Sequence, residues 1–417
     1  MTPTADPPAN LASDPGATFR SAIAVLNTKS ADYAVELVSQ LLRHANQAGA
    51  SDIHLQPEKD SLCVRWRLDG VLHQVATLPG SVSRNICARL KVLADLLTYQ
   101  TDTPQEGRIR ETALGIEQRV STFPTLFGEK VVVRLFAESR RFRDVSELAH
   151  PADVTAGLMS LLEATAGAIV IAGPAGSGKT TTLYACLRTL QARSQGARSL
   201  VSLEDPIESV VDGVAQSQVN PRTGFDLASG LRAMMRQDPE VIAIGEMRDR
   251  VTAEAALGAA LTGHLILTTF HAPSAAGVVG RLLDMQIEPY VLRSGLIGIL
   301  AQRLFRRLCS CKVEACDESQ RLGLPIAAAW RANGCAECAG TGYRGRFVLS
   351  ELLRFETKEI ALAVLGRGDV AEIQAAAVAQ GMVPLAKRAC DAVEAGTTSA
   401  LEVRRVLGLE HYETDAT

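Results

Sequence analysis

The spacing of apolar residues in the first third of the chain predicts an α+β domain. Residues 32–48 place apolar side chains at helical spacing, and Gly49 stands where a helix is expected to end. Shorter stretches alternate apolar and polar residues, as half-buried strands do, and Asp69-Gly70 supplies a hairpin turn. The elements expected here are helices at 32–48 and 82–97 and strands at 53–56, 64–68, from 71–72 onwards after the turn, 116–122 and 130–135.

The middle of the chain follows another pattern, in which short and wholly apolar runs alternate with segments of helical spacing. The runs 166–172, 199–203 and 241–244 are typical of buried strands. After the first run, apolar residues recur on one helix face between residues 183 and 190. Such alternation of strand and helix predicts a mostly parallel sheet and hence an α/β fold.

Changes in composition divide the chain into six segments. Prolines among small and polar residues mark the first segment as a mobile tail, and mixed charged and apolar residues mark a linker between the two domains. The predicted organisation is a tail at 1–28, an α+β domain at 29–139, a linker at 140–155, an α/β core at 156–304, a cysteine-bearing subdomain at 305–345 and a helical region at 346–417.

Length and composition narrow the classes of function. The 417 residues suffice for two or three domains, and the 21% of charged residues are typical of a globular protein. A net charge of −3 does not favour nucleic acid as a partner. No apolar run could cross a bilayer and no signal segment is evident, so we expect a cytoplasmic protein that could still dock on a membrane complex. The nine cysteines favour reduced thiols or a metal over disulfides.

A glycine-rich loop, GPAGSGKTTTL, joins the run 166–172 to a helix. It fits G-x-x-x-x-G-K-[ST] in the strand–turn–helix context that this pattern requires. Its backbone can wrap closely around phosphates, which N–H groups and the positive helix end attract. Lys179 is expected to reach the β- and γ-phosphates, and the Thr180 hydroxyl to ligate Mg²⁺. The residues expected to bind the nucleotide are Gly173, Pro174, Ala175, Gly176, Ser177, Gly178, Lys179, Thr180 and Thr181.

Carboxylates follow two of the apolar runs. Glu204, Asp205 and Glu208 come directly after the second run, and Glu246 comes after the third. In an open parallel sheet these strand ends lie near the phosphate loop. Carboxylates placed there can hold Mg²⁺ through water or take a proton from the attacking water, and Glu246 is the expected partner on the magnesium side. A solvated acidic loop is the alternative for the first group.

Two histidines flank a further apolar strand in the sequence TGHLILTTFHA. His271 follows the strand, at the edge where a γ-phosphate sensor is expected, and His264 precedes it. A lone histidine is more often structural. The position beside the predicted phosphate site favours a nucleotide role for His271 over one for His264.

Four cysteines form two pairs near the end of the core. Cys309 and Cys311 precede Cys335 and Cys338 by roughly two dozen residues. Two thiolate pairs at this separation are typical of a zinc ribbon, in which Zn²⁺ stabilises a fold that lacks its own core. The first pair is C-x-C, tighter than usual, so Cys316 could replace one ligand. Buried free thiols are the alternative.

In this order the motifs resemble the hexameric secretion ATPases of type II secretion and type IV pilus assembly, over nearly the whole chain from residue 32. ASDIHLQPE, VRWRLDG, PQEGRI, RVSTFP and GEKVVVRL are similar to the family's second N-terminal domain. The loop resembles its Walker A box, SLEDPIE its Asp box, LRAMMRQDPEVIAIGEMRD its Walker B segment and TGHLILTTFHA its His box. The cysteine pairs, AQRLFRRLC and TGYRGR are similar to the extension and secretion branch.

The resemblance implies a ring hexamer in which each subunit joins a mobile, PAS-like α+β domain to a RecA-like P-loop ATPase core. ATP hydrolysis with Mg²⁺ would drive pilin or pseudopilin assembly through an inner-membrane platform protein, to which the motor would bind peripherally. Glu204 would activate water, Glu246 would be the Walker B carboxylate and His271 the His-box contact. Arg119 and Arg134 match arginines of the mobile domain that reach the γ-phosphate. Ion pairs that hold the fold are the alternative for both arginines.

The chain also departs from the family pattern. Its His box has TTFHAP where the family more often has leucine before the histidine, which affects the sensing geometry. Only the Pro-rich tail stands in place of the family's large first N-terminal domain, so recruitment to a membrane by that domain is not expected. The other functions considered are a pilus retraction motor, a nucleic-acid translocase on the same core and a nucleotide-bound adaptor that hydrolyses ATP weakly. The cysteine element disfavours the first, the net charge disfavours the second and the altered His box permits the third.

Overall fold

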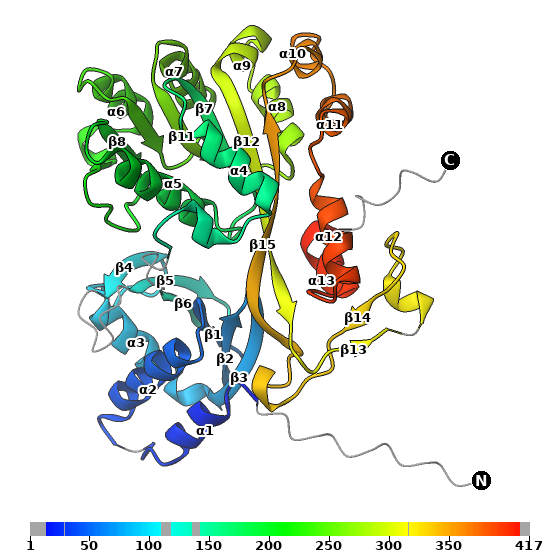
Figure 1. The fold of residues 1–417 in the computed structure, drawn as a ribbon. Helices are drawn as coiled ribbons and strands as arrows, with labels where there is room; N and C mark the ends of the chain where they lie inside the picture. Colours follow the sequence, from blue (N-terminus) through cyan, green and yellow to red (C-terminus); the bar gives the residue numbers. More distant parts are fainter. Residues whose placement is uncertain (1–13, 29, 110–117, 136–141, 316, 409–417) are drawn as a thin grey trace. The chain divides into compact units, whose positions relative to one another are not determined.

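The computed structural model describes residues 14–28, 30–109, 118–135, 142–315 and 317–408. The chain forms two compact units, which are described separately below (Figure 1). Unit 1 comprises Met1–Glu138, Leu308–Val313 and Ala332–Gly345, and unit 2 comprises Ser139–Arg307, Glu314–Arg331 and Arg346–Thr417. Among the described residues, every helix is too short or too polar to span a bilayer.

Unit 1 is built on a six-stranded antiparallel sheet in the order β3-β2-β1-β6-β5-β4. Ile53 lies opposite Trp66 and Leu55 opposite Val64, so these alternating apolar residues share one face and form a core with the helices. The α+β domain expected from the sequence is therefore present. Its elements are α1 (Ala17–Ala24), α2 (Tyr33–Gln47), α3 (Ser83–Leu93), β1 (Asp52–Pro57), β2 (Ser61–Leu68), β3 (Val71–Pro79), β4 (Gln105–Ile109), β5 (Gln118–Thr125) and β6 (Gly128–Leu135).

Helix α1 corrects the sequence prediction of a tail that reaches residue 28. Phe19 is fully buried, with its ring centroid 5.6 Å from that of Trp66. Arg20 donates a hydrogen bond of 2.7 Å to the carbonyl oxygen of Val75 in β3. An eight-residue helix offers too few apolar positions for a periodic pattern to appear in the sequence. Residues 1–13 of the predicted tail lie outside the described residues.

Unit 2 contains a seven-stranded sheet in the order β15-β12-β7-β11-β10-β8-β9. The strands β7, β8, β10 and β11 are buried along their whole length and pair in parallel, as their apolar runs predict. The strands of this sheet are β7 (Gly167–Ala172), β8 (Leu200–Glu204), β9 (Ala215–Gln218), β10 (Val241–Ile244), β11 (Leu265–Phe270), β12 (Leu296–Leu308) and β15 (Tyr343–Arg354). One further pair of short strands, outside this sheet, consists of β13 (Val313–Glu314) and β14 (Trp330–Arg331).

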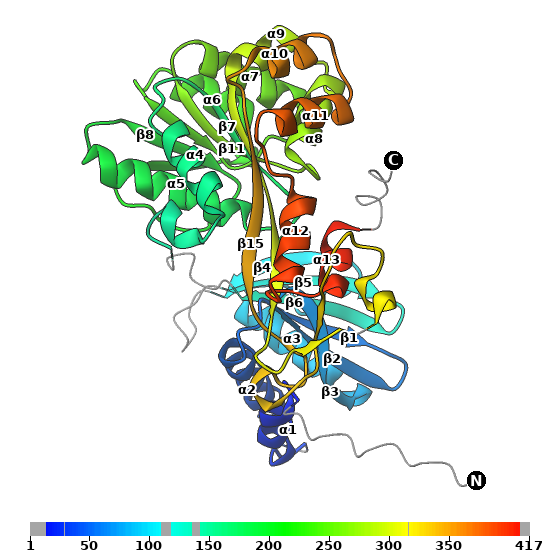
Figure 2. The ribbon, with the colours of Figure 1, turned by 45° about the vertical axis from the view of Figure 1, so that its right-hand side comes forward.

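Helices cover both faces of this sheet, as Figure 1 and the turned view in Figure 2 show. Side chains from α4 and α5 pack with Ile169 and Ile171 of β7, whereas side chains from α7, α8 and α9 pack in the cluster that contains Ala168 and Val170. Neighbouring residues of β7 thus face opposite layers. The helices are α4 (Ala152–Leu161), α5 (Lys179–Ser194), α6 (Leu227–Met234), α7 (Arg250–Leu261), α8 (Ala275–Asp284) and α9 (Pro289–Gly295).

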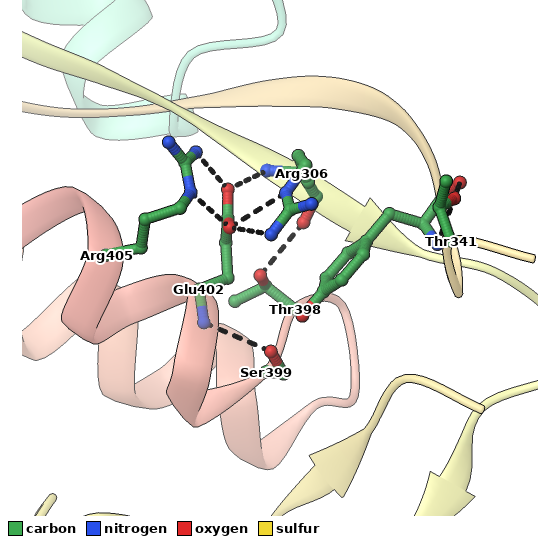
Figure 3. A network of polar contacts seen from close by, with 7 residues as sticks. Arg306, Thr341, Thr398, Ser399, Glu402 and Arg405 are labelled. Carbon is green, nitrogen blue, oxygen red and sulfur yellow. Dashed lines mark hydrogen bonds and ion pairs between the residues drawn. The ribbon is translucent and has the colours of Figure 1, made fainter. Parts of the chain in front are cut away.

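The last four helices end the described chain, and a buried carboxylate fixes the final one to β12. The side chain of Glu402 is fully buried and accepts hydrogen bonds of 2.6–2.9 Å from Arg306 and Arg405 (Figure 3). Burial alone would raise the pKa of Glu402, but the bonds from the two arginines lower it, so the carboxylate stays charged. These helices are α10 (Lys358–Leu365), α11 (Val370–Ala379), α12 (Leu385–Glu394) and α13 (Ala400–Leu407).

The segment boundaries differ from the sequence prediction at three places. Part of the predicted linker belongs to unit 2, because Val145 is fully buried and its N–H donates to Thr189 Oγ1 at 3.1 Å. The predicted helical region begins with the long strand β15, whose apolar residues pair into the sheet beside β12. The predicted cysteine subdomain is divided, since its two cysteine-bearing ends belong to unit 1 and residues 314–331 to unit 2.

The buried His150 predicts a loss of stability in mild acid. Its Nδ1 lies 2.8 Å from Ser350 Oγ, and its Nε2 is buried with no hydrogen-bond partner among the described residues. Protonation would bury an unpaired N–H, and burial lowers the pKa of His150 to about 4. Because the unfolded histidine has a pKa of about 6.5, the folded state loses stability as the pH falls through 6.5 towards 4, by roughly 3 kcal/mol in all.

The neutral variant His150→Gln isolates this contribution. Between pH 7 and pH 5, the free energy of unfolding in urea should fall by about 2 kcal/mol more in the native protein than in His150→Gln. Equal losses in the two proteins would contradict the assignment.

Candidate functional site

The glycine-rich loop lies between β7 and α5, as the sequence predicts. Gly173, Gly176 and Gly178 all have positive φ angles, of 155°, 74° and 89°. A Cβ atom on Gly173 would lie 2.3 Å from Ser177 Oγ and 2.7 Å from the carbonyl oxygen of Gln302. The first glycine of the pattern is therefore required both by its backbone angles and by the lack of space.

Lys179, the first residue of α5, folds back over this loop. Its Nζ donates hydrogen bonds of 2.9 Å and 3.0 Å to the carbonyl oxygens of Gly173 and Pro174. Only 8% of the residue is exposed. Burial lowers the pKa of Lys179, while the charge of Glu246 opposes this shift. The loop thus holds a cation at the positive end of a helix, an arrangement suited to phosphate groups.

Gln302 of β12 supports the loop, and sequence reasoning missed it. Its Nε2 donates 2.8 Å to the carbonyl oxygen of Ser177, and its Oε1 accepts 2.8 Å from Thr182 Oγ1 in α5. The side chain is buried next to β7. A polar residue in the middle of the apolar run that forms β12 was the available signal, because buried amides occur where they have partners.

Glu204 ends β8 and is deeply buried. Its carboxylate accepts hydrogen bonds from Ser202 Oγ at 2.6 Å, from Gln216 Nε2 at 3.0 Å and from the hydroxyl of Tyr184. The Tyr184 oxygen in turn accepts from the backbone N–H groups of Glu208 and Ser209, at 2.9 Å and 3.2 Å. Burial raises the pKa of Tyr184, and the hydrogen bond to the charged Glu204 carboxylate raises it further.

Glu246 and His271 lie together at the ends of β10 and β11, as the sequence predicts. His271 Nε2 lies 2.8 Å from Glu246 Oε1, and Arg248 Nε donates 2.8 Å to Oε2 of the same carboxylate. Thr269 Oγ1 donates 2.6 Å to the carbonyl oxygen of Gly245, which joins the two strand ends. The side chain of Glu246 is 17% exposed, so its carboxylate remains reachable from solvent.

The second histidine lies at the other end of the same strand. His264 precedes β11, and its Nδ1 lies 3.0 Å from the carbonyl oxygen of Ala259 in α7. Because β11 is extended and buried throughout, His264 and His271 lie at opposite edges of the sheet. In this position His264 contacts the last turn of α7.

Arg119 and Arg134 belong to the sheet of unit 1, where carboxylates hold both. Arg119 forms an ion pair with Glu106 on β4, and Arg134 Nε lies 3.1 Å from Asp52 Oδ1 on β1. These contacts correspond to the fold-holding ion pairs that the sequence left as an alternative. Contact of either arginine with a nucleotide stays a prediction.

The four predicted cysteines of unit 1 come together. The Sγ atoms of Cys309, Cys311, Cys335 and Cys338 all lie within 4.8 Å of one another. Three of their separations are 3.8–3.9 Å. A tetrahedral site with Zn–S bonds of about 2.3 Å places its sulfurs about 3.8 Å apart. The backbone N–H groups of Cys335 and Gly342 donate to Cys338 Sγ at 3.1 Å and 3.2 Å, which favours the thiolate form.

The tight C-x-C pair therefore reaches the geometry of a metal site without a further ligand. Cys316, considered from the sequence as a substitute, lies outside the described residues. The donor set of four thiols suits Zn²⁺.

Known proteins resemble this chain over most of its length. A family model described as "Type II/IV secretion system protein" matches residues 27–405. The "Type II secretion system ATPase E" of Vibrio cholerae serotype O1 is 40% identical over 383 residues, which cover 89% of this chain and 75% of that protein. The "Type IV pilus assembly ATPase PilB" of Thermus thermophilus is 36% identical over 381 residues, which cover 89% of this chain and 42% of that protein.

Solved structures support the fold. The X-ray structure of the Legionella pneumophila ATPase DotB has a TM-score of 0.64 and 22% identity, and the match covers 88% of this chain and 94% of that one. The crystal structure of the pilus retraction motor PilT with bound ADP has a TM-score of 0.52 and 24% identity, and the match covers 84% of this chain and 96% of that one. At these identities the likeness concerns the fold alone, and it confirms the predicted α/β architecture with a RecA-like core.

Proposed function

Because this chain belongs to the type II/IV secretion system protein family, we propose that it is an ATPase that powers pilin or pseudopilin assembly or protein secretion. The observation that carries the proposal is the glycine-rich loop with Lys179 folded over it, at the same sheet edge as Glu246 and His271. We further propose that the chain works as a ring hexamer in the cytoplasm and binds an inner-membrane platform protein. These last points rest on the family resemblance.

The residues of the loop fit ATP and Mg²⁺. ATP would supply the phosphoanhydride bond, and Mg²⁺ would offset the charge of the phosphates. The Lys179 ammonium donates hydrogen bonds to two carbonyl oxygens of the loop. When ATP binds, the ammonium can donate to β- and γ-phosphate oxygens in place of these carbonyl oxygens. The Thr180 hydroxyl and the Glu246 carboxylate would hold the magnesium side, and His271 would orient Glu246 through the contact at 2.8 Å.

The geometry favours Glu208, in place of Glu204, as the residue that takes a proton from water. The oxygens of Glu204 are occupied by three donors, and the residue is only 4% exposed. Glu208 is exposed, and Tyr184 holds its backbone N–H. We therefore propose that Glu204 positions Tyr184 and, through it, Glu208.

The relatives described above do not favour the other functions considered, which are a retraction motor, a nucleic-acid translocase and an adaptor. These relatives are a type II secretion ATPase and a type IV pilus assembly ATPase, which favours these processes over nucleic-acid translocation. The likeness to a retraction motor concerns the fold alone and gives no reason to prefer retraction. A weakly hydrolysing adaptor differs from a motor in the turnover number of the native protein, which single-turnover and steady-state hydrolysis of ATP would measure.

We also propose that the four cysteines hold one Zn²⁺. The separations near 3.8 Å between sulfurs and the N–H groups that face Cys338 support this proposal over buried free thiols. The ion would fix residues 309–311 to residues 335–338 within unit 1, where few apolar side chains could do so.

Removal of the loop lysine tests the ATPase proposal. Lys179→Ala should reduce the turnover of ATP about 100-fold or more, because the loop loses its phosphate-binding cation, while the thermal unfolding midpoint stays close to that of the native protein. The control is Lys387→Ala, which removes an exposed lysine that contacts Asp391 on α12. Turnover by Lys179→Ala equal to that of the control would contradict the proposal.

Matched amide variants separate the two glutamates. Glu208→Gln should lower kcat by about 10²–10⁴-fold with little change in KM or in stability, because a general base is lost. Glu204→Gln should lower the unfolding midpoint as well, since an amide cannot accept from all three donors that face it. Full turnover in Glu208→Gln with an inactive but stable Glu204→Gln would reverse the assignment.

Metal analysis tests the cysteine site. Elemental analysis of the purified protein should find about one zinc per chain, and Cys335→Ser should lose most of it. The control is Cys63→Ser, which changes a buried cysteine of unit 1 outside the cluster. The same zinc content in all three proteins would remove these ligands from consideration.

A further inference from the structure

Unit 2 contains a cavity of about 250 Å³ where β15, α4, α10, α11 and α12 meet. Its walls include Asp153 of α4, Arg354 of β15, Thr357 ahead of α10 and Arg388 of α12. None of the residues of the glycine-rich loop lines it, nor do Glu204, Glu246 or His271. The cavity is therefore a separate place in the molecule, and the proposed ATPase function does not use it.

Three polar atoms on its lining residues are buried without a hydrogen-bond partner. They are Arg354 Nε, Arg388 Nε and Thr357 Oγ1, and none of them meets a donor or acceptor among the described residues. Buried polar groups in proteins are nearly always paired, so three such atoms around one cavity need an explanation. Two of them can only donate, and the third is a hydroxyl that can also donate.

The ion pairs of the two arginines use Nη2 and leave the Nε–H groups without a partner among the described residues. Asp153 contacts the terminal Nη2 of Arg388, and Glu356 contacts Nη2 of Arg354. The two carboxylates are 58% and 54% exposed, whereas the Arg388 side chain is 12% exposed. The acids thus lie towards solvent. Arginine binds oxyanions through parallel N–H groups, and its Nε–H forms one side of that fork.

The start of α10 adds partial positive charge to a lining whose two arginines are balanced by two carboxylates, Asp153 and Glu356. Thr357 is the N-cap residue of α10, yet its side chain makes no capping hydrogen bond. The first N–H groups of a helix carry partial positive charge and attract anions. The remaining wall includes the apolar side chains of Ile360, Ala377 and Met382. One side of the cavity therefore suits an anionic group and the other suits carbon.

We propose that this cavity binds a small phosphorylated molecule. Donors that come from three separate elements suit the several oxygens of a tetrahedral phosphate better than a planar carboxylate, which accepts mainly in one plane. The volume lies just below the roughly 300–1,000 Å³ of most ligand pockets, which fits a metabolite smaller than a nucleotide. The phosphate contacts Arg354, Arg388 and Thr357, and the carbon part lies against the apolar wall.

Calorimetric titration of the full chain tests the site. The titrations use Lys179→Ala, so that the glycine-rich loop does not bind the probes, and the probes are inorganic phosphate, glycerol 3-phosphate and succinate. Both phosphates should bind in that background. Adding Thr357→Val, which removes one hydroxyl, or Arg354→Lys, which keeps the charge but removes Nε–H, should weaken phosphate binding at least tenfold. Adding Lys387→Ala, an exposed lysine outside the cavity, should change it less than twofold.

Three results would overturn the proposal. The first is the absence of binding of both phosphates at about 10 mM to a protein with a native unfolding midpoint. The second is phosphate binding that neither Thr357→Val nor Arg354→Lys weakens. The third is succinate binding as tight as that of glycerol 3-phosphate, which would indicate a site for carboxylates. Loss of ATP turnover in Lys179→Ala is measured separately, so neither proposal depends on the other.

Discussion

The parallel pairing of the buried strands in unit 2 decides where the functional groups lie. Ala172 of β7 is paired with Phe270 of β11, and Ile244 of β10 is paired with Leu203 of β8. All four strands therefore end at one edge of the sheet, and the residues that follow them are brought side by side. The lysine, the carboxylates and His271 occupy this edge for that reason, although they are distant in the sequence.

Much of this edge could be predicted, because a strand buried on both faces leaves a continuous apolar run and a phosphate loop leaves its glycines. The residues that support the loop could not be predicted from the sequence. Gln302 and Tyr184 act across elements that only the tertiary fold brings together, and the motifs that contain or adjoin them do not indicate these contacts. Helix α1 was missed for another reason: it depends on the burial of Phe19 against Trp66 and has no periodic pattern of its own.

The cysteine cluster was likewise predictable only in part. The two pairs predicted the four thiols, because pairs of cysteines at short spacing commonly share a metal. The prediction of an independent subdomain did not anticipate that the cysteine-bearing segments join the sheet domain. Within unit 1, the N–H of Gly345 donates 3.0 Å to Asp69 Oδ2 in the turn between β2 and β3. This contact depends on a hairpin turn far away in the sequence, which spacing alone cannot indicate.

The acidic segment after β8 shows why the sequence could not rank its carboxylates. Within five residues the chain passes from a buried strand to an exposed turn, so Glu204 and Glu208 have opposite environments. Tyr184 links them, since its hydroxyl contacts the Glu204 carboxylate and accepts from the Glu208 N–H. Tyr184 also belongs to α5, the helix that begins at Lys179. Helix α5 and the acidic turn are therefore held together, which would keep Lys179 and Glu208 in a fixed relation during the proposed reaction.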